Sequence, residues 1–350
     1  MLKTLYMHIG NQRTATTSIQ AFLQQNAGPL AKQGYFSANG RRRHDLLMQR
    51  LFNGNLQMGA FIQDLQNQAT QHKAKHGVEQ HSVFITDEAI CQRKDLTQID
   101  TLKEHFDVKI IFALRRQDLW LESWYFQNIK WQWDPDLAHL TFDEFLERRG
   151  DFHWAHYDQH LRMIEGHFGQ ENIRLIPFET GQLPDGPVNA FCRLMDLQDL
   201  SAFSQPQHLN GSLSATMVEF IRNLPLDAIP VAQRELLRHC LQRVDQEVFG
   251  HCGRQSERLL EPDHRRQILS DYAEGNAAVA QRYFGRDDLF MDPLPADDTP
   301  LAELKIPSDS GELMEQFVVP FITQLVLDDM LKAPGAPEPA APPQPARKVS

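Results

Sequence analysis

HIGNQRTATTSIQ, residues 8 to 20, is the stretch of this chain that decides its fold. It begins inside a short apolar run, residues 5 to 10, and continues into residues 16 to 26, whose apolar side chains fall on one face of a helix. This order predicts a strand, a loop and a helix. Backbone N–H groups and the positive end of the helix can hold an anion at such a loop. Threonine and serine are also favoured helix caps, so a plain strand-to-helix turn is the competing interpretation.

The loop does not fit the pattern of ATP-binding or GTP-binding loops. That pattern is G-x-x-x-x-G-K-[ST], and counting from Gly10 its Gly-Lys pair would fall on Ala15 and Thr16. Hydrolysis of ATP or GTP is therefore not expected.

Further apolar runs follow the loop at intervals. The runs 82–86, 108–114 and 173–179 are short and β-rich, as strands covered on both faces are. Helices are expected over 16–26, 45–76, 118–133, 152–168, 187–197, 212–224, 231–248, 263–284 and 312–332. Strands alternating with helices in this way predict an α/β fold: a parallel sheet flanked by helices in three layers, with a helical C-terminal half.

Length and composition suggest one domain. We expect it to span residues 1–332, with its core in 4–180 and a helical portion in 187–332. Residues 333–350 are rich in Pro and Ala, cannot bury a core, and are expected to form a disordered tail.

Several classes of protein are disfavoured by charge and hydropathy. The net charge of −11 argues against a nucleic-acid binder, which needs Lys and Arg to neutralise phosphates, so any anion site must be local. No run of about 18 apolar residues suggests a membrane span, and the first residues lack a signal-peptide pattern, so a cytoplasmic protein is expected. The cysteines are too few and scattered for a disulfide framework, and their spacing matches no familiar zinc pattern; they are Cys91, Cys192, Cys240 and Cys252. We therefore expect no metal site.

A second polar stretch, LRRQDLWLESWYFQ at 114 to 127, follows one of the expected strands. Arg115 and Arg116 stand at the strand end, and Ser123 lies eight residues beyond Arg115, about two turns into the next helix. An arginine fork suits phosphate, and a serine hydroxyl can reach the same group. One of the two arginines is expected to be an ordinary ion-pair partner at the strand end.

Together the two stretches resemble a known family. HIGNQRTATTSIQ resembles the 5′-phosphosulfate loop of sulfotransferases, which has a Lys-Thr-Gly-Thr-Thr core. LRRQDLWLESWY resembles their 3′-phosphate motif, in which arginine and serine lie eight residues apart. The similarity is closest to bacterial sulfotransferase-like proteins and covers most of residues 4 to 290, including VFITDE, IRLIPFE, HLNGSLS at 208 to 214 and AEGNAAVAQRYFG at 273 to 285.

The resemblance implies a fold of the P-loop type, related to nucleotide kinases. It implies that the chain binds 3′-phosphoadenosine 5′-phosphosulfate (PAPS) and transfers its sulfuryl group to a hydroxyl or amine, with no metal required. Arg13 takes the place of the family's lysine and is expected at the bridging and leaving oxygens, while Arg115 and Ser123 are expected to hold the 3′-phosphate. The loop residues implied to bind the cofactor are Asn11, Gln12, Arg13, Thr14, Ala15, Thr16, Thr17 and Ser18.

This chain departs from the family pattern within the loop. Arg13 keeps the charge of lysine but is bulkier and lacks its compact ammonium head, so whether it supports turnover at the leaving oxygen stays open. Ala15 replaces a glycine and narrows the loop if that position needs a positive φ. The adenine loop of animal cytosolic members has no clear match here.

Sulfuryl transfer also needs a base for the acceptor. Glu88 is the first choice because it ends the run 82–86, and the carboxyl ends of parallel strands face the ligand crevice. A surface carboxylate is the competing interpretation, and His44 is another candidate base or acceptor contact. Arg41, Arg42 and Arg43 form either a solvated face or a site for an anionic acceptor. Most of the tryptophans are expected in the core, but some could stack on a sugar; they are Trp120, Trp124, Trp131, Trp133 and Trp154.

The sequence is therefore best interpreted as a PAPS-dependent sulfotransferase. Its acceptor is expected to be a small molecule or a glycan, with a carbohydrate or lipid-linked glycan preferred, and its oligomeric state is not predicted. A catalytically silent nucleotide-binding protein of the same fold is the alternative, and a nucleotide kinase is the least favoured.

Overall fold

The computed structural model describes residues 2–197, 199–206, 212–250 and 258–328. The expected tail 333–350, residue Cys252 and residues 208–211 of HLNGSLS lie outside the described residues.

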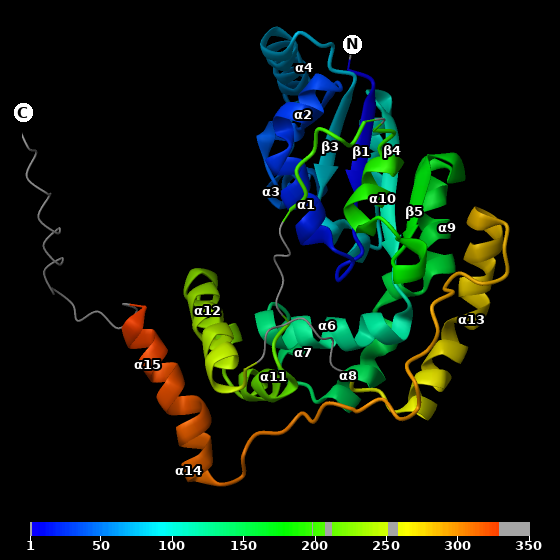
Figure 1. The fold of residues 1–350 in the computed structure, drawn as a ribbon. Helices are drawn as coiled ribbons and strands as arrows, with labels where there is room; N and C mark the ends of the chain where they lie inside the picture. Colours follow the sequence, from blue (N-terminus) through cyan, green and yellow to red (C-terminus); the bar gives the residue numbers. More distant parts are fainter. Residues whose placement is uncertain (1, 198, 207–211, 251–257, 329–350) are drawn as a thin grey trace, which may run out of the picture.

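A five-stranded parallel sheet organises the first half of the chain (Figure 1). Its strands are β1 (Thr4–His8), β2 (Tyr35–Ser37), β3 (Ser82–Thr86), β4 (Asp107–Leu114) and β5 (Ile173–Pro177). They lie in the order β2-β3-β1-β4-β5, and every paired strand is parallel to its neighbour. The predicted α/β fold with a parallel sheet, flanking helices and a helical C-terminal region is therefore confirmed.

Side chains alternate between the two faces of the sheet. Leu5 and Met7 belong to one buried cluster, whereas Tyr6 between them belongs to another. The smaller cluster includes side chains from α1 (Thr16–Gln25) and α10 (Gly186–Leu194). The larger cluster includes side chains from α3 (Asp45–Phe52), α4 (Met58–His76), α5 (Thr97–Asp100) and α9 (Tyr157–Phe168). Both faces are covered, which explains why the strands are continuously apolar.

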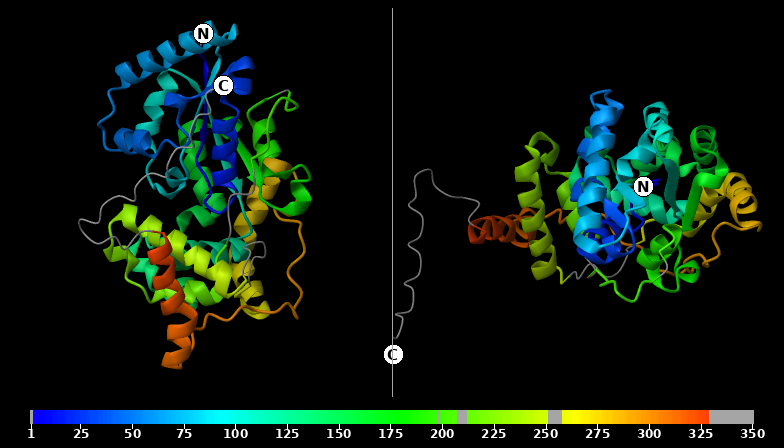
Figure 2. Two further views of the ribbon diagram at one scale, coloured as in Figure 1. Left: turned by 60° about the vertical axis from the view of Figure 1, so that its left-hand side comes forward. Right: turned by 90° about the horizontal axis from the view of Figure 1, so that it is seen from above.

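Below the carboxyl ends of the strands lies a helical layer, which Figure 1 and the left view of Figure 2 show. It contains α6 (Gln117–Trp131), α11 (Ala215–Arg222) and α12 (Val231–Val248). The remaining helices are α2 (Ala27–Lys32), α7 (Pro135–Ala138), α8 (Phe142–Glu147), α13 (Pro262–Phe284), α14 (Ser310–Leu313) and α15 (Val319–Leu327). In the described ranges, no helix combines the length and the apolar character that crossing a membrane would need.

One expected helix is divided in two. The expectation of a continuous helix over 45–76 is wrong, because α3 ends at Phe52 and α4 begins at Met58. Gly54, in the intervening turn, has φ +68°, a left-handed conformation that glycine adopts without steric cost.

A group of buried charged residues fixes α6 against α13. Asp118 accepts from Arg116 at 2.8 Å and from Arg265 of α13 at 2.5 Å. Arg265 also pairs with Glu122 at 2.9 Å. Because these side chains are almost fully buried, breaking one pair would leave an uncompensated charge in the core. The first half of α6 is therefore held in one orientation.

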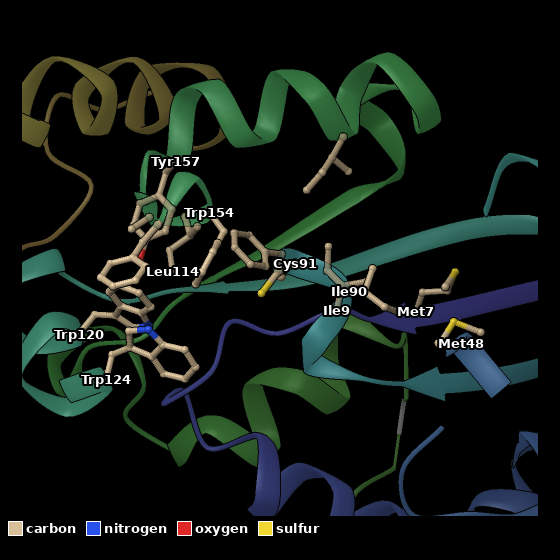
Figure 3. Packing of buried hydrophobic residues seen from close by; sticks show 14 of the residues in the cluster. Met7, Ile9, Met48, Ile90, Cys91, Leu114, Trp120, Trp124, Trp154 and Tyr157 are labelled. Atoms are coloured by element: carbon tan, nitrogen blue, oxygen red, sulfur yellow. The ribbon is translucent and has the colours of Figure 1, made fainter. Parts of the chain in front are cut away.

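Aromatic side chains of α6 complete the core beside this ion network (Figure 3). Trp120 stacks on Trp124 with ring centroids 5.7 Å apart, and both meet Trp154 edge-on. These three tryptophans are buried, as expected for most of the series. Trp131 and Trp133 lie elsewhere and belong to the site described next.

Candidate functional site

The loop after β1 is held between two other elements. The Gln12 side chain donates to the backbone carbonyl of Glu88 at 2.9 Å, and the indole N–H of Trp120 donates to the Gln12 carbonyl at 3.1 Å. Within the loop, the Thr14 hydroxyl donates to the Asn11 carbonyl at 2.5 Å. The loop is thus fixed by the residues that follow β3 and by α6.

Two loop residues without glycine's freedom adopt left-handed backbone. Arg13 has φ +64° and Ala15, the N-cap of α1, has φ +61°. A side chain in this region costs about 1–2 kcal/mol relative to right-handed backbone. Position 15 therefore has the geometry in which glycine would be unstrained, and Ala15 holds it at a cost.

A cavity of about 1250 Å³ opens beside this loop. Among the residues singled out from the sequence, those that line it are Gln12, Arg13, Ala15, Thr16, Thr17, Ser18, Arg43, Glu88, Arg115, Trp131 and Trp133. Asn11 and Thr14 are buried behind the loop surface and do not line the cavity. The structure thus brings the loop, the end of β3 and the end of β4 around one space.

Arg13 and Arg115 meet at the wall of this cavity. The Arg13 Nε donates to the Ser123 hydroxyl at 2.6 Å, and its Nη1 donates to the Gln127 side-chain carbonyl at 3.1 Å. Arg115 Nη1 donates to the Arg13 backbone carbonyl at 2.7 Å. Four residues from the two sequence stretches therefore lie together, although Arg13 and Ser123 are 110 positions apart.

In the described part of the chain, no direct ion pair neutralises these two arginines. Neither Arg13 nor Arg115 forms an ion pair within residues 2–197, 199–206, 212–250 and 258–328. Burial lowers the pKa of Arg13, and burial together with the positive charge of Arg13 lowers the pKa of Arg115 to about 10. Two poorly solvated cations side by side make a favourable place for an anion.

The neighbouring arginine has a different role. Arg116 is buried, pairs with Asp118 and donates to the Asp292 carbonyl at 2.8 Å. The expectation that one member of the Arg115-Arg116 pair is an ordinary strand-end ion-pair partner is confirmed for Arg116.

Glu88 lies directly after β3 with its carboxylate at the cavity. Its Oε2 accepts from the Gln20 side chain at 2.8 Å, and its Oε1 lies 3.7 Å from Arg43. The Glu88 side chain is 17% exposed, so it is held in place and still reachable from the cavity. Asp87, just before it, also pairs with Arg43, but burial raises the pKa of Asp87 above its usual range.

His44 has a structural position. The Thr86 N–H donates to its Nδ1 at 3.0 Å, and its Nε2 lies 2.8 Å from the Ala38 carbonyl. The side chain is buried and does not line the cavity, and burial lowers the pKa of the imidazole. Both ring nitrogens are thus engaged with backbone, in the tautomer that carries its proton on Nε2.

Two solved sulfotransferase structures are similar to this chain. A sulfotransferase from Alicyclobacillus acidocaldarius is 15% identical, with a TM-score of 0.40, over 68% of this chain and 97% of the other. A sulfotransferase domain from the curacin biosynthetic pathway is 13% identical, with a TM-score of 0.32, over 57% of this chain and 76% of the other. No protein-family model matches the sequence, and no curated protein matches it.

Metal ligands are not gathered anywhere in the part of the chain that the structure describes. There, no three His, Cys, Asp or Glu side chains are placed together to hold a metal ion.

One wall of the cavity was missed by the sequence reasoning. The polar face of α12 lines it through Glu235, Arg238, His239, Gln242, Arg243 and Gln246. Their spacing marks one side of a helix, a signal present in the sequence but shared with any solvated helix face. The stacked rings of Trp131 and Trp133 stand at the same end, with centroids 4.7 Å apart.

Proposed function

We propose that this protein binds PAPS in the cavity and transfers its sulfuryl group to a hydroxyl or amine of an acceptor. The observation that supports this most directly is that Arg13 and Arg115 lie together at one wall of the cavity, with the Ser123 hydroxyl hydrogen-bonded to the Arg13 side chain. Two half-buried guanidinium groups without a carboxylate ion-pair partner among the described residues, beside a hydroxyl and the N-terminus of α1, suit a ligand that carries two separate anionic groups.

Each end of such a cofactor has a matching set of residues. The backbone N–H groups and hydroxyls of Thr16, Thr17 and Ser18 at the start of α1 would hold the 5′-phosphosulfate. Arg115 and Ser123 would hold the 3′-phosphate, the group that distinguishes this cofactor from ATP. No residue in this arrangement requires a metal.

The reaction follows from these positions. The acceptor oxygen or nitrogen attacks sulfur, the bond between sulfur and the bridging oxygen breaks, and its electron pair passes to the phosphate. Adenosine 3′,5′-bisphosphate leaves. Arg13 and the N–H groups of the loop stabilise the charge that develops on this leaving group. Glu88, oriented by Gln20, takes the proton of the acceptor. His44 has no part in this scheme because its ring nitrogens serve the backbone.

A catalytically silent nucleotide-binding protein is the second candidate. The Arg13 side chain reaches across to Ser123 and Gln127, so a guanidinium in this position is partly used by the protein itself. In that case the cavity would bind the bisphosphate without turnover.

Calorimetric titration tests the proposal. Adenosine 3′,5′-bisphosphate is expected to bind at least about tenfold more tightly than adenosine 5′-monophosphate, because only the bisphosphate provides an anion for Arg115. ATP is the second comparison. Stronger binding of ATP than of the bisphosphate would overturn the proposal. Turnover of radiolabelled sulfate donor in a screen of glycan acceptors then separates the enzyme from the silent binding protein.

A further inference from the structure

The end of the cavity formed by α6 and α12 has its own chemistry. Gln132, the residue after α6, has φ +43°, and this left-handed turn reverses the chain so that Trp133 stacks on Trp131. Gln132 is fixed there, because its side chain donates to the carbonyls of Ile221 and Leu224 at 2.9 and 3.0 Å. Trp133 is nevertheless 51% exposed. A large, rigid aromatic surface is therefore left open at the cavity.

Arg238 of α12 lies against the other member of this pair. Its guanidinium carbon is 4.2 Å from the centre of the Trp131 ring, and the residue is only 8% exposed. It has no ion-pair partner among the described residues, and its Nε has no hydrogen-bond partner there. Its other contacts are to Gln242 at 3.5 Å and to His239 at 3.1 Å. Arg238 is thus a buried cation at the cavity wall that retains hydrogen-bonding capacity.

Other arginines of the same helix differ from Arg238. Arg234, one turn earlier, donates to the backbone carbonyls of Trp131, Gln132, Asp227 and Ile229 and fastens α12 to the end of α6. Arg243 is neutralised by Asp328 at 2.5 Å. Of these three, only Arg238 combines a place at the cavity with the lack of a carboxylate or backbone-carbonyl partner among the described residues.

Lys130 adds positive charge to the same end. It lines the cavity, and burial together with the charges of Arg238 and Arg13 lowers the pKa of its amine to about 8. Glu235 is the carboxylate that α12 contributes to this wall, and it forms no ion pair with Arg238. The positive charge therefore continues from Arg13 to the far end of the cavity.

We propose that Trp131, Trp133, Lys130 and Arg238 form a subsite for a carboxylate-bearing ring. The planar guanidinium fork matches a carboxylate, and an indole face matches the flat side of a sugar or aryl ring. If the proposed function holds, this ring belongs to the acceptor, because the subsite is two turns of α6 beyond Ser123 and the anion site beside it. The acceptor is then an acid.

Matched ligand pairs test the subsite directly. Methyl glucuronide and methyl glucoside differ in a carboxylate, as do 4-hydroxybenzoate and 4-hydroxybenzyl alcohol. Binding is measured by quenching of tryptophan fluorescence and by calorimetry, with and without saturating adenosine 3′,5′-bisphosphate. At least one acid is expected to bind about tenfold or more tightly than its neutral partner, the range of a charge-assisted hydrogen bond. The pair that discriminates more shows whether the ring is a sugar or an aryl group.

Variants of α12 show which side chain causes the preference for the acid. Arg238→Met is expected to abolish the preference for the acid, and Arg238→Lys to keep part of it. Arg243→Met, five residues along the same helix, is the matched control and is expected to keep it whole. Equal binding of acid and neutral ligand by the wild-type protein in both pairs would overturn the subsite, and so would an unchanged preference in folded Arg238→Met.

The two proposals fail separately. If the bisphosphate binds but neither pair discriminates, the subsite is wrong and the nucleotide site stands. If an acid is preferred but the bisphosphate does not bind, the subsite stands and the sulfotransferase proposal is wrong.

Discussion

Replacing the adjacent residues Arg115 and Arg116 by methionine, one at a time, should affect two different properties of the protein. Arg115 faces the cavity and forms no ion pair with a carboxylate in the described ranges, whereas Arg116 is paired with buried Asp118. Methionine keeps much of the volume and removes the charge in both cases. We expect Arg115→Met to impair ligand binding and Arg116→Met to impair folding stability.

The magnitudes follow from the contacts. Loss of the Arg115 fork should weaken binding of adenosine 3′,5′-bisphosphate by about 1.5–3 kcal/mol, roughly a 10- to 150-fold rise in Kd. Its hydrogen bond to the Arg13 carbonyl is worth about 1 kcal/mol, but removal of a positive charge beside Arg13 offsets that loss. The free energy of unfolding should therefore change by less than about 1 kcal/mol. Arg116→Met breaks a buried pair and should lower it by about 3 kcal/mol, since Asp118 keeps Arg265.

Calorimetry gives the dissociation constants, and urea unfolding gives the stabilities of the two variants and the wild type. The reasoning is refuted if Arg115→Met binds the bisphosphate as tightly as the wild type. It is also refuted if the two variants lose the same free energy of unfolding.

Four further changes test the loop, the base and the core. Ala15→Gly should raise the free energy of unfolding by about 0.5–1 kcal/mol, because the relief of left-handed strain exceeds the added entropy of the unfolded chain. The control Ala21→Gly, within α1, should lower the free energy of unfolding by about 1 kcal/mol, and equal effects of the two changes in urea unfolding would contradict this prediction. Arg13→Met should lower kcat about 100-fold and Arg13→Lys should not, whereas turnover seen only with lysine would mean that the natural protein is silent. Glu88→Gln should lower kcat about 100-fold with the affinity for the bisphosphate unchanged, and an unchanged kcat would remove Glu88 as the base. His8, the last residue of β1, is buried, and burial lowers its pKa from 6.5 to about 4. The unfolded chain therefore takes up its proton first, and stability is lost as pH falls from about 6.5 to 4. The loss of unfolding free energy between pH 7 and pH 4 should be about 3 kcal/mol smaller in His8→Leu than in the wild type, and an equal loss would show that His8 does not cause this pH dependence.

The sequence predicted the parts of the fold that have a strong local pattern. Four strands were expected from apolar runs because buried parallel strands are apolar on both faces, and β3 has the predicted bounds of 82–86. β2 spans only Tyr35–Ser37, too short for any periodicity to show. The gap between α3 and α4 depends on a turn at Gly54; the dipeptide Asn53-Gly54 is a turn signal, but apolar residues at helical spacing on both sides outweighed it in the prediction.

Most of the lining residues expected from the sequence lie in the two stretches that carry the resemblance, and Arg43, Glu88, Trp131 and Trp133 were singled out beyond them. Arg115 and Ser123 were expected to act together from their spacing, and they lie on either side of Arg13. The hydrogen bond between Arg13 and Ser123 joins segments that are distant in the sequence, so no local sequence pattern predicts it. Arg238 was missed for a similar reason. Its burial results from packing of α12 on the end of α6, and in the sequence it is one of several arginines on an ordinary polar helix.

The helix α6 also sets the distance between the anion site and the tryptophan pair. Ser123 and Trp131 are eight residues apart on one uninterrupted helix, which corresponds to about 12 Å along its axis. Buried ion pairs anchor the first half of α6 to α13, and Arg234 of α12 holds its end through the carbonyls of Trp131 and Gln132, so this spacing changes little when a ligand enters. A molecule that reaches both ends of the cavity must therefore match a fixed span, and shorter homologues of the same compound can occupy only one end at a time.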